Sequence, residues 1–235
     1  MCEPPNLWVK ARDALSEDEK EWFDALGRPE QLSLTPAQQI DEIIHQTRNK
    51  KKELGKSRGG QRKCFDNIVK WLDTFKSVGD VISSFDPVHA ALPWAAFRFV
   101  LQIAVAKHNY DDDVIEILAW IPHFLFTGQV LESLYTPNSM RLDGVPDENK
   151  IAEQSLDRLR NEVIKLYSGV LSALKFCAVW FEKRRASRTI DVVVNSSKPG
   201  DVLQDLKKLY TQAVHYRDAL QVWIYKSIAH PLFVT

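Results

Sequence analysis

The sequence contains few of the residues that form disulfides or bind metal ions. Its 235 residues include three cysteines, Cys2, Cys64 and Cys177. They are too few and too widely spaced for a disulfide framework or a zinc site, so a reducing, intracellular compartment fits best. The six histidines offer no alternative, because no two lie three or four residues apart on one helix face. We therefore expect no metal and no other cofactor.

The sequence also lacks an excess of charge of either sign. It has 31 Lys plus Arg and 31 Asp plus Glu residues, for a formal net charge of zero. A general nucleic-acid binder is usually basic, overall or along one face, so this class is disfavoured. The N-terminus has no basic region followed by an apolar run, so no signal peptide is expected. With 45% hydrophobic residues the chain can bury a sizeable core, and we expect it in the cytoplasm.

A nucleotide-binding loop is missing as well. Gly55-Lys56-Ser57 has the ending of a P-loop, but the loop needs a glycine five residues earlier, and that position is Lys50. What precedes it is a polar, basic helix end rather than a buried strand. We therefore predict neither nucleotide binding nor an enzymatic activity.

What the sequence does contain is helical periodicity along nearly its whole length. Helices are predicted to begin at the Ser16–Glu19 capping box, at Thr35-Pro36, and at Cys64, with a kink near Gly79. From about Glu148 onwards two long apolar patterns flank Pro199-Gly200, and a short turn there would let the two helices pack antiparallel. The expected fold is an all-α, elongated bundle of six to eight helices. Residues 1–60 would form N-terminal helices and a basic linker, packed on a helical bundle of residues 61–235.

Two apolar segments dominate the middle of the chain, Val88 to Ala106 and Val114 to Leu131. Both approach the length of a transmembrane helix. Prolines and polar residues interrupt each of them, so a buried helical hairpin at the centre of the bundle is the better interpretation.

Arg98 is the one full charge in the first apolar segment. A buried arginine needs a carboxylate partner or an exit to solvent. We expect a structural pair with Glu116, and Asp80, Asp86 and Glu132 are the alternatives.

The first apolar helix opens with the motif Asp86-Pro87-Val88-His89-Ala90-Ala91-Leu92-Pro93-Trp94-Ala95. It resembles the signature of the helical N-terminal domain of fungal NACHT-type, NLR-like STAND receptors, and the likeness extends over roughly Cys64 to Arg188. Asp86 suits an N-cap and Pro87 the first helical position. We interpret the signature positions as architectural; they are Asp86, Pro87, His89, Pro93, Trp94 and Arg98.

In such receptors this domain precedes a NACHT nucleotide-binding domain and repeats, and is thought to transmit a signal on oligomerisation in non-self recognition or regulated cell death. The present sequence has no Walker motif, so the resemblance implies a stand-alone relative or part of a larger receptor. It implies a non-enzymatic signalling or adaptor domain, whose partner is a NACHT receptor or another copy of itself. The alternative is a membrane-active, HeLo-like effector that binds lipid or forms pores.

Two groups of residues are candidates for these contacts. The basic residues Lys50, Lys51, Lys52, Lys56 and Arg58 would dock on anionic lipid headgroups or an acidic partner, or else belong to a solvated linker. Aromatic residues surround the last helix, and one partner helix can bury only one stripe of it. Trp223 and Tyr225 are therefore candidates for self-association.

Overall fold

The chain folds into α-helices. The computed structural model describes residues 6–26, 36–54, 59–77, 87–106, 112–134, 146–186 and 198–229, and within these ranges it contains eight helices and no strand. The helices are α1 (Leu7–Asp13), α2 (Glu17–Ala25), α3 (Pro36–Glu53), α4 (Gly59–Ser77), α6 (Pro87–Ala106), α7 (Asp112–Leu134), α8 (Pro146–Ala186) and α9 (Pro199–Ala229). The predicted all-α, multi-helix bundle is confirmed.

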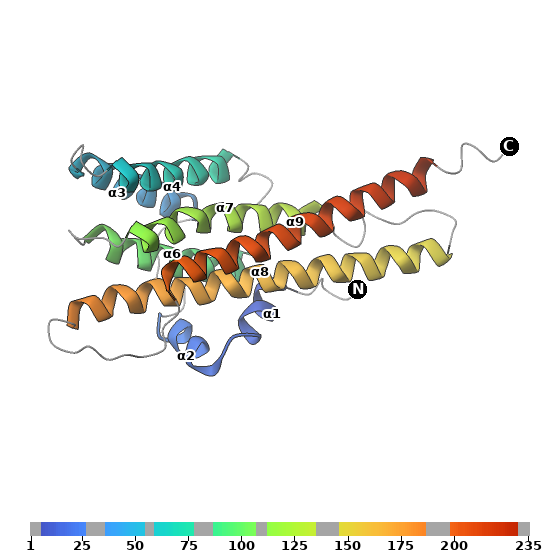
Figure 1. The fold of residues 1–235 in the computed structure, drawn as a ribbon, viewed down its shortest axis with the longest axis horizontal. Coiled ribbons are helices and arrows are strands. Elements are labelled where there is room, and N and C mark those ends of the chain that lie inside the picture. Colours follow the sequence, from blue (N-terminus) through green and yellow to red (C-terminus); the bar gives the residue numbers. More distant parts are fainter. Residues whose placement is uncertain are drawn as a thin grey trace.

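The helices are arranged in layers along one long axis (Figure 1). α3 and α4 pair on one side of the molecule, α6 and α7 lie in the middle, and the long helices α8 and α9 follow. α1 and α2 cover the outer side of α8. α8 and α9 run in opposite directions and share the most extensive contact in the fold, so the predicted antiparallel pair is confirmed.

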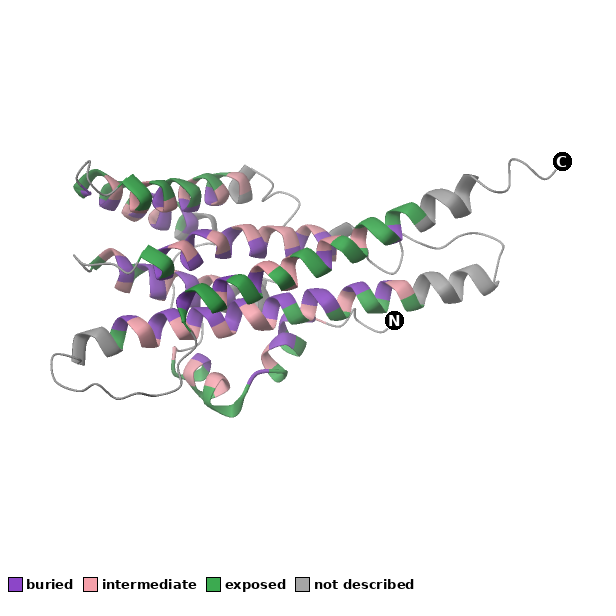
Figure 2. Ribbon diagram, viewed as in Figure 1, coloured by how far each residue is buried: buried purple, intermediate pink, exposed green. Residues whose placement is uncertain are grey.

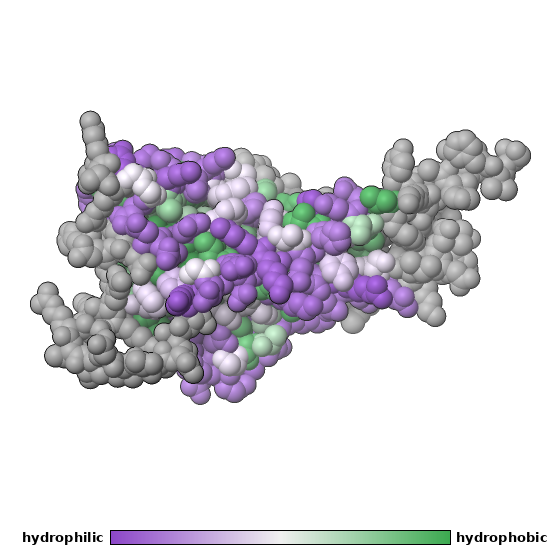
Figure 3. Space-filling model, in the orientation of Figure 1, coloured by the Kyte–Doolittle hydropathy of each residue, from purple (hydrophilic) through white to green (hydrophobic). Residues whose placement is uncertain are grey.

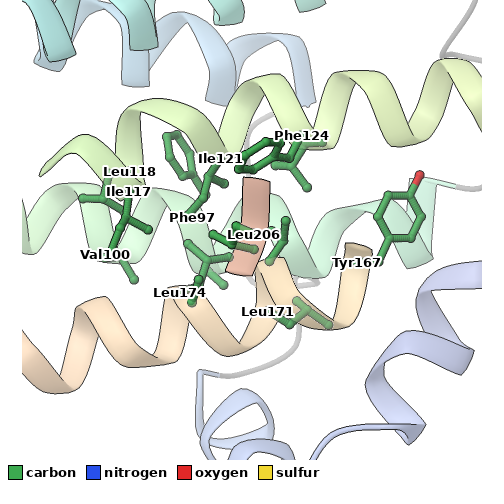
Figure 4. Packing of buried hydrophobic residues seen from close by; sticks show 14 of the residues in the cluster. Phe97, Val100, Ile117, Leu118, Ile121, Phe124, Tyr167, Leu171, Leu174 and Leu206 are labelled. Atoms are coloured by element: carbon green, nitrogen blue, oxygen red, sulfur yellow. The ribbon is translucent and has the colours of Figure 1, made fainter. Parts of the chain in front are cut away.

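The core lies where α6, α7, α8 and α9 meet. Buried residues line their facing sides (Figure 2), and side chains from all four helices interlock there (Figure 4). Those labelled are Phe97, Val100, Ile117, Leu118, Ile121, Phe124, Tyr167, Leu171, Leu174 and Leu206. The buried residues form one cluster that extends from Leu7 in α1 to Leu220 in α9.

The two apolar segments are helices with largely buried side chains, as predicted, but they do not form a self-contained hairpin. α6 lies most extensively against α8 and then α3, and α7 lies against α4, α8 and α9; their contact with each other is smaller. A helix that is apolar on nearly every side needs neighbours on several sides. For α6 and α7 those neighbours are the amphipathic helices that pack around them.

Helix boundaries follow local capping chemistry. At α2 the predicted capping box is present, because the Ser16 side chain accepts from Glu19 N–H while the Glu19 carboxylate accepts from Ser16 N–H. The predicted turn at Pro199-Gly200 is wrong, since both residues belong to the first turn of α9. Proline fits the first helical position, where its missing N–H costs nothing. The expected kink at Gly79 lies outside the described residues.

Candidate interaction surfaces

Two of the signature positions, Pro93 and Trp94, lie in the packed part of α6. Pro93 lies within the helix rather than at its first turn, and it is buried. The ring of Trp94 contacts the ring of Phe97 edge-on, with 6.0 Å between the ring centroids. Both positions suit the architectural role given to them above. Asp86 and the side chains of Pro87 and His89 lie outside the part of the chain that the structure describes.

Arg98 pairs with a residue that the sequence analysis did not consider. Its Nη1 lies 4.0 Å from Oε2 of Glu42 in α3, and its side chain is 19% exposed. The predicted partner, Glu116, instead binds Nζ of Lys207 at 3.4 Å and accepts a hydrogen bond from Trp120 Nε1. The prediction is wrong because α6 turns this face towards α3 rather than α7.

The basic segment does not form a uniform docking surface. Lys50 is only 6% exposed and its Nζ lies 3.1 Å from Glu53 Oε2, so its charge is not available to a lipid headgroup. Lys51 forms an ion pair with Asp66 of α4, while Lys52 is exposed. All three lie in the last turn of α3, so they are helical rather than part of a linker. Lys56 and Arg58 lie outside the described ranges.

Residues 55–59 also match the Gly-x-Ser-x-Gly pattern of a hydrolase nucleophile elbow. That elbow holds its serine on a sharp turn between a strand and a helix. In this chain α3 precedes the pattern, and the last residue of the pattern, Gly59, is the first residue of α4. An open depression at the start of α4 is lined by Gly59, Arg62, Lys63 and Asp66. Its basic side chains share the space with a carboxylate, so we assign it no ligand.

The long helices extend past the rest of the bundle. Tyr167 of α8 donates a hydrogen bond to Glu132, which is the third residue from the end of α7. The 21 residues of α8 that precede Tyr167 span about 31 Å at about 1.5 Å per residue, and they run beyond α7 beside the last part of α9 (Figure 1). We call residues 146–166 of α8 and the adjoining C-terminal part of α9 the α8–α9 arm.

The described side chains of α9, in residues 199–222, expose a mostly polar surface, and two large hydrophobic residues are the exceptions. Tyr216 is 38% exposed and Val222 is 56% exposed. Figure 3 shows hydrophobic residues exposed between hydrophilic ones on this face of the molecule. Tyr210, one of the aromatic residues around α9, faces inward and contacts His123 and Phe124 of α7. The side chains of Trp223 and Tyr225 lie outside the described residues, so their predicted role stays a prediction.

A half-buried aromatic cluster joins α4, α7 and α9. It consists of Trp71, Trp120, His123, Phe124, Phe126 and Tyr210. Lys207 of α9 lies 4.7 Å from the centre of the Trp120 ring, in the position of a cation–π contact. The sequence offered a signal, because Trp120, His123 and Phe124 share one face of α7 at helical spacing.

Within the part of the chain that the structure describes, two helices are long and apolar enough to cross a membrane by length and composition. The first is Asp112–Glu132 in α7, where 67% of the most apolar stretch is buried in the fold. The second is Gln154–Glu182 in α8, where 50% of the corresponding stretch is buried. A buried core helix of a water-soluble bundle has the same apolar composition.

Among the described residues, no group of three or more His, Cys, Asp and Glu side chains could hold a metal ion. No family model, curated protein or solved structure matches this chain.

Proposed function

We propose that this chain is a non-enzymatic helical signalling or adaptor domain that acts through protein–protein contact, in the manner of the N-terminal domains of fungal NLR-like receptors. The observation that carries the proposal is the α8–α9 arm. The two long helices project beyond α7 (Figure 1), and two large apolar side chains of α9, Tyr216 and Val222, are exposed. A domain built to enclose a small substrate needs a cavity instead.

The first partner that we propose is a second copy of the chain. Val222 of α9 has 56% of its surface exposed, and Tyr216, which is 38% exposed, lies less than two turns away. The two side chains are six positions apart in the chain, which places them about 120° apart around the helix, so the proposed contact centres on Val222. Trp223 and Tyr225 belong to the same stretch of sequence. A NACHT receptor with a complementary surface is the second partner in this proposal.

Static light scattering on the full chain tests this proposal. Val222→Glu places a charge on the exposed apolar position and should lower the dimer fraction at a given concentration at least several-fold. Gln204→Glu adds the same charge at an exposed position near the start of the same helix, and should leave the dimer fraction unchanged. If both variants and the wild-type chain have the same monomer mass at every concentration, the arm does not mediate self-association.

A second candidate function is a membrane-active effector. It is favoured by the apolar length of α7 and of residues 154–182, which would have to leave the core to enter a bilayer. Flotation with anionic and neutral vesicles separates the two functions. An effector should be retained by anionic vesicles and lose binding in Lys52→Gln, while Lys50→Gln should matter less because Lys50 is already buried. If both kinds of vesicle retain the protein equally, or if neither retains it, the basic residues do not mediate membrane binding.

A further inference from the structure

His123 lies where three helices meet. From α7 its ring centre is 4.1 Å from that of Trp71 in α4 and 4.9 Å from that of Tyr210 in α9. Trp120 and Phe124 flank it on its own helix, at 5.7 and 5.9 Å. Its Nδ1 is buried and has no hydrogen-bond partner in the described structure. A titratable ring thus takes the place of an apolar core residue at this junction.

The charged groups near the His123 ring would not stabilise the positive charge of its protonated form. α9 brings Lys207, which lies over the Trp120 ring and is itself a cation. The carboxylate on this side is Glu116 of α7, and it already binds Lys207 and Trp120. α4 contributes the uncharged ring of Trp71. A proton on the buried Nδ1 would therefore find no hydrogen-bond acceptor among the described residues, and the carboxylate of Glu116 already binds Lys207.

We propose that His123 is an acid-sensitive junction, at which protonation loosens α4 and α9 from α7 and exposes the aromatic cluster. The proposal depends on the packing at the junction and not on the proposed function. Burial lowers the pKa of His123 below its ordinary value of 6.5. The stability that the neutral ring contributes is therefore fully present above pH 6.5, and is lost as the pH falls from there through the lower, folded-state pKa. Within that window the folding equilibrium constant falls by up to about tenfold for each pH unit.

An opposing effect makes the experiment necessary. Imidazolium is attracted to the faces of tryptophan and tyrosine rings, and a strong cation–π contact would raise the pKa of His123 instead. The direction of the shift therefore decides between a junction that opens in acid and one that tightens.

The test uses the full chain. The pKa of His123 is read from the pH dependence of its imidazole carbon-bound proton in two-dimensional NMR, with the signal assigned by its loss in His123→Phe. Urea unfolding is measured in parallel at pH 7.5 and pH 5.0 for the wild type, for His123→Phe and for His215→Gln, which changes an exposed histidine of α9. We expect a pKa below 6.5, and a loss of folding equilibrium constant on acidification that is several-fold smaller in His123→Phe than in the other two proteins.

A pKa at or above 6.5 would overturn the proposal, and so would equal acid sensitivity in the wild type and His123→Phe. If His123→Phe does not fold, the signal is assigned through His123→Gln, and the wild-type titration alone decides the sign. Tryptophan fluorescence gives a further readout, because Trp71 and Trp120 should become more accessible to iodide at pH 5.0 than at pH 7.5. Unchanged quenching at both pH values would show that the cluster stays closed.

Discussion

The ring of Trp8 in α1 stacks on the ring of Tyr167 in α8, with the centroids 3.6 Å apart and the planes 9° from parallel. The hydroxyl of Tyr167 then donates a hydrogen bond to Glu132 Oε2 of α7 at 3.1 Å. Glu132 also accepts from the backbone N–H of Leu7, in the first turn of α1. The N-terminal helix is therefore joined through one tyrosine to α8 and α7.

Gly128→Ala should destabilise the fold. A Cβ at Gly128 would overlap Cε1 of the Tyr167 ring, and that ring is fixed by Trp8 and Glu132 and cannot easily move aside. Overpacking of this kind costs about 1–3 kcal/mol in the free energy of unfolding, measured by urea titration. The control is Gly60→Ala, where nothing lies within 4 Å of the added atom. Equal stability of the two variants would show that Tyr167 is free to repack.

Trp8→Ala should detach α1. The side chain is 5% exposed, and truncation of a buried tryptophan costs about 3–5 kcal/mol unless the element can open on its own. Because α1 has seven residues, it should open locally, and its amide protons should lose their protection from hydrogen exchange while those of α7 keep theirs. Val9→Ala changes a neighbour that is 40% exposed and should leave the exchange of α1 unchanged. Full protection of α1 in Trp8→Ala would contradict this picture.

Glu132→Gln should affect stability in a pH-dependent way. Burial raises the pKa of Glu132, although the hydrogen bonds from Tyr167 and Leu7 oppose the shift. The folded state therefore favours the protonated carboxyl, and the associated stability is present below about pH 4.5 and is lost as the pH rises through the folded-state value. A glutamine carries no charge and keeps one carbonyl oxygen that can accept from Tyr167. We expect Glu132→Gln to be at least as stable as the wild type at pH 7, with the difference shrinking towards pH 4. A variant that is much less stable at pH 7 would mean that the ionised carboxylate is needed.

The Arg98–Glu42 contact should be weak. The facing atoms, Arg98 Nη1 and Glu42 Oε2, are 4.0 Å apart and both buried, but neither has a hydrogen bond in the described structure, so the pair gains little beyond the cost of its own desolvation. A double-mutant cycle with Arg98→Met and Glu42→Gln should give a coupling energy below about 1 kcal/mol. The same cycle with Glu116→Gln should give none, because Glu116 binds Lys207. A coupling of several kcal/mol in the first cycle would indicate a closer pair than the structure contains.

Much of the fold could be predicted from the sequence because its signals are local. The Ser16 capping box and the alternating three- and four-residue apolar spacing of α8 and α9 each lie within a few turns of chain. α1 was not predicted, because a seven-residue helix is marginal by itself and forms here by docking on α8. Its one local signal is Asn6, whose side chain accepts from the N–H groups of Trp8 and Val9.

The candidate surfaces were harder to predict, since they depend on which helices become neighbours. The burial of Lys50 and the Arg98–Glu42 contact both follow from the position of α3, and nothing in the sequence of α6 indicates that α3 lies beside it. The aromatic cluster around His123 likewise combines residues from α4, α7 and α9, which are more than 130 positions apart at their extremes.

Sedimentation equilibrium of the wild-type chain over a hundredfold range of concentration tests the proposed role of the α8–α9 arm most directly. The average mass should rise with concentration from the monomer value of 27.0 kDa towards twice that value, and Val222→Glu should shift the rise to higher concentration. A constant mass of 27.0 kDa across the whole range would contradict self-association through the arm.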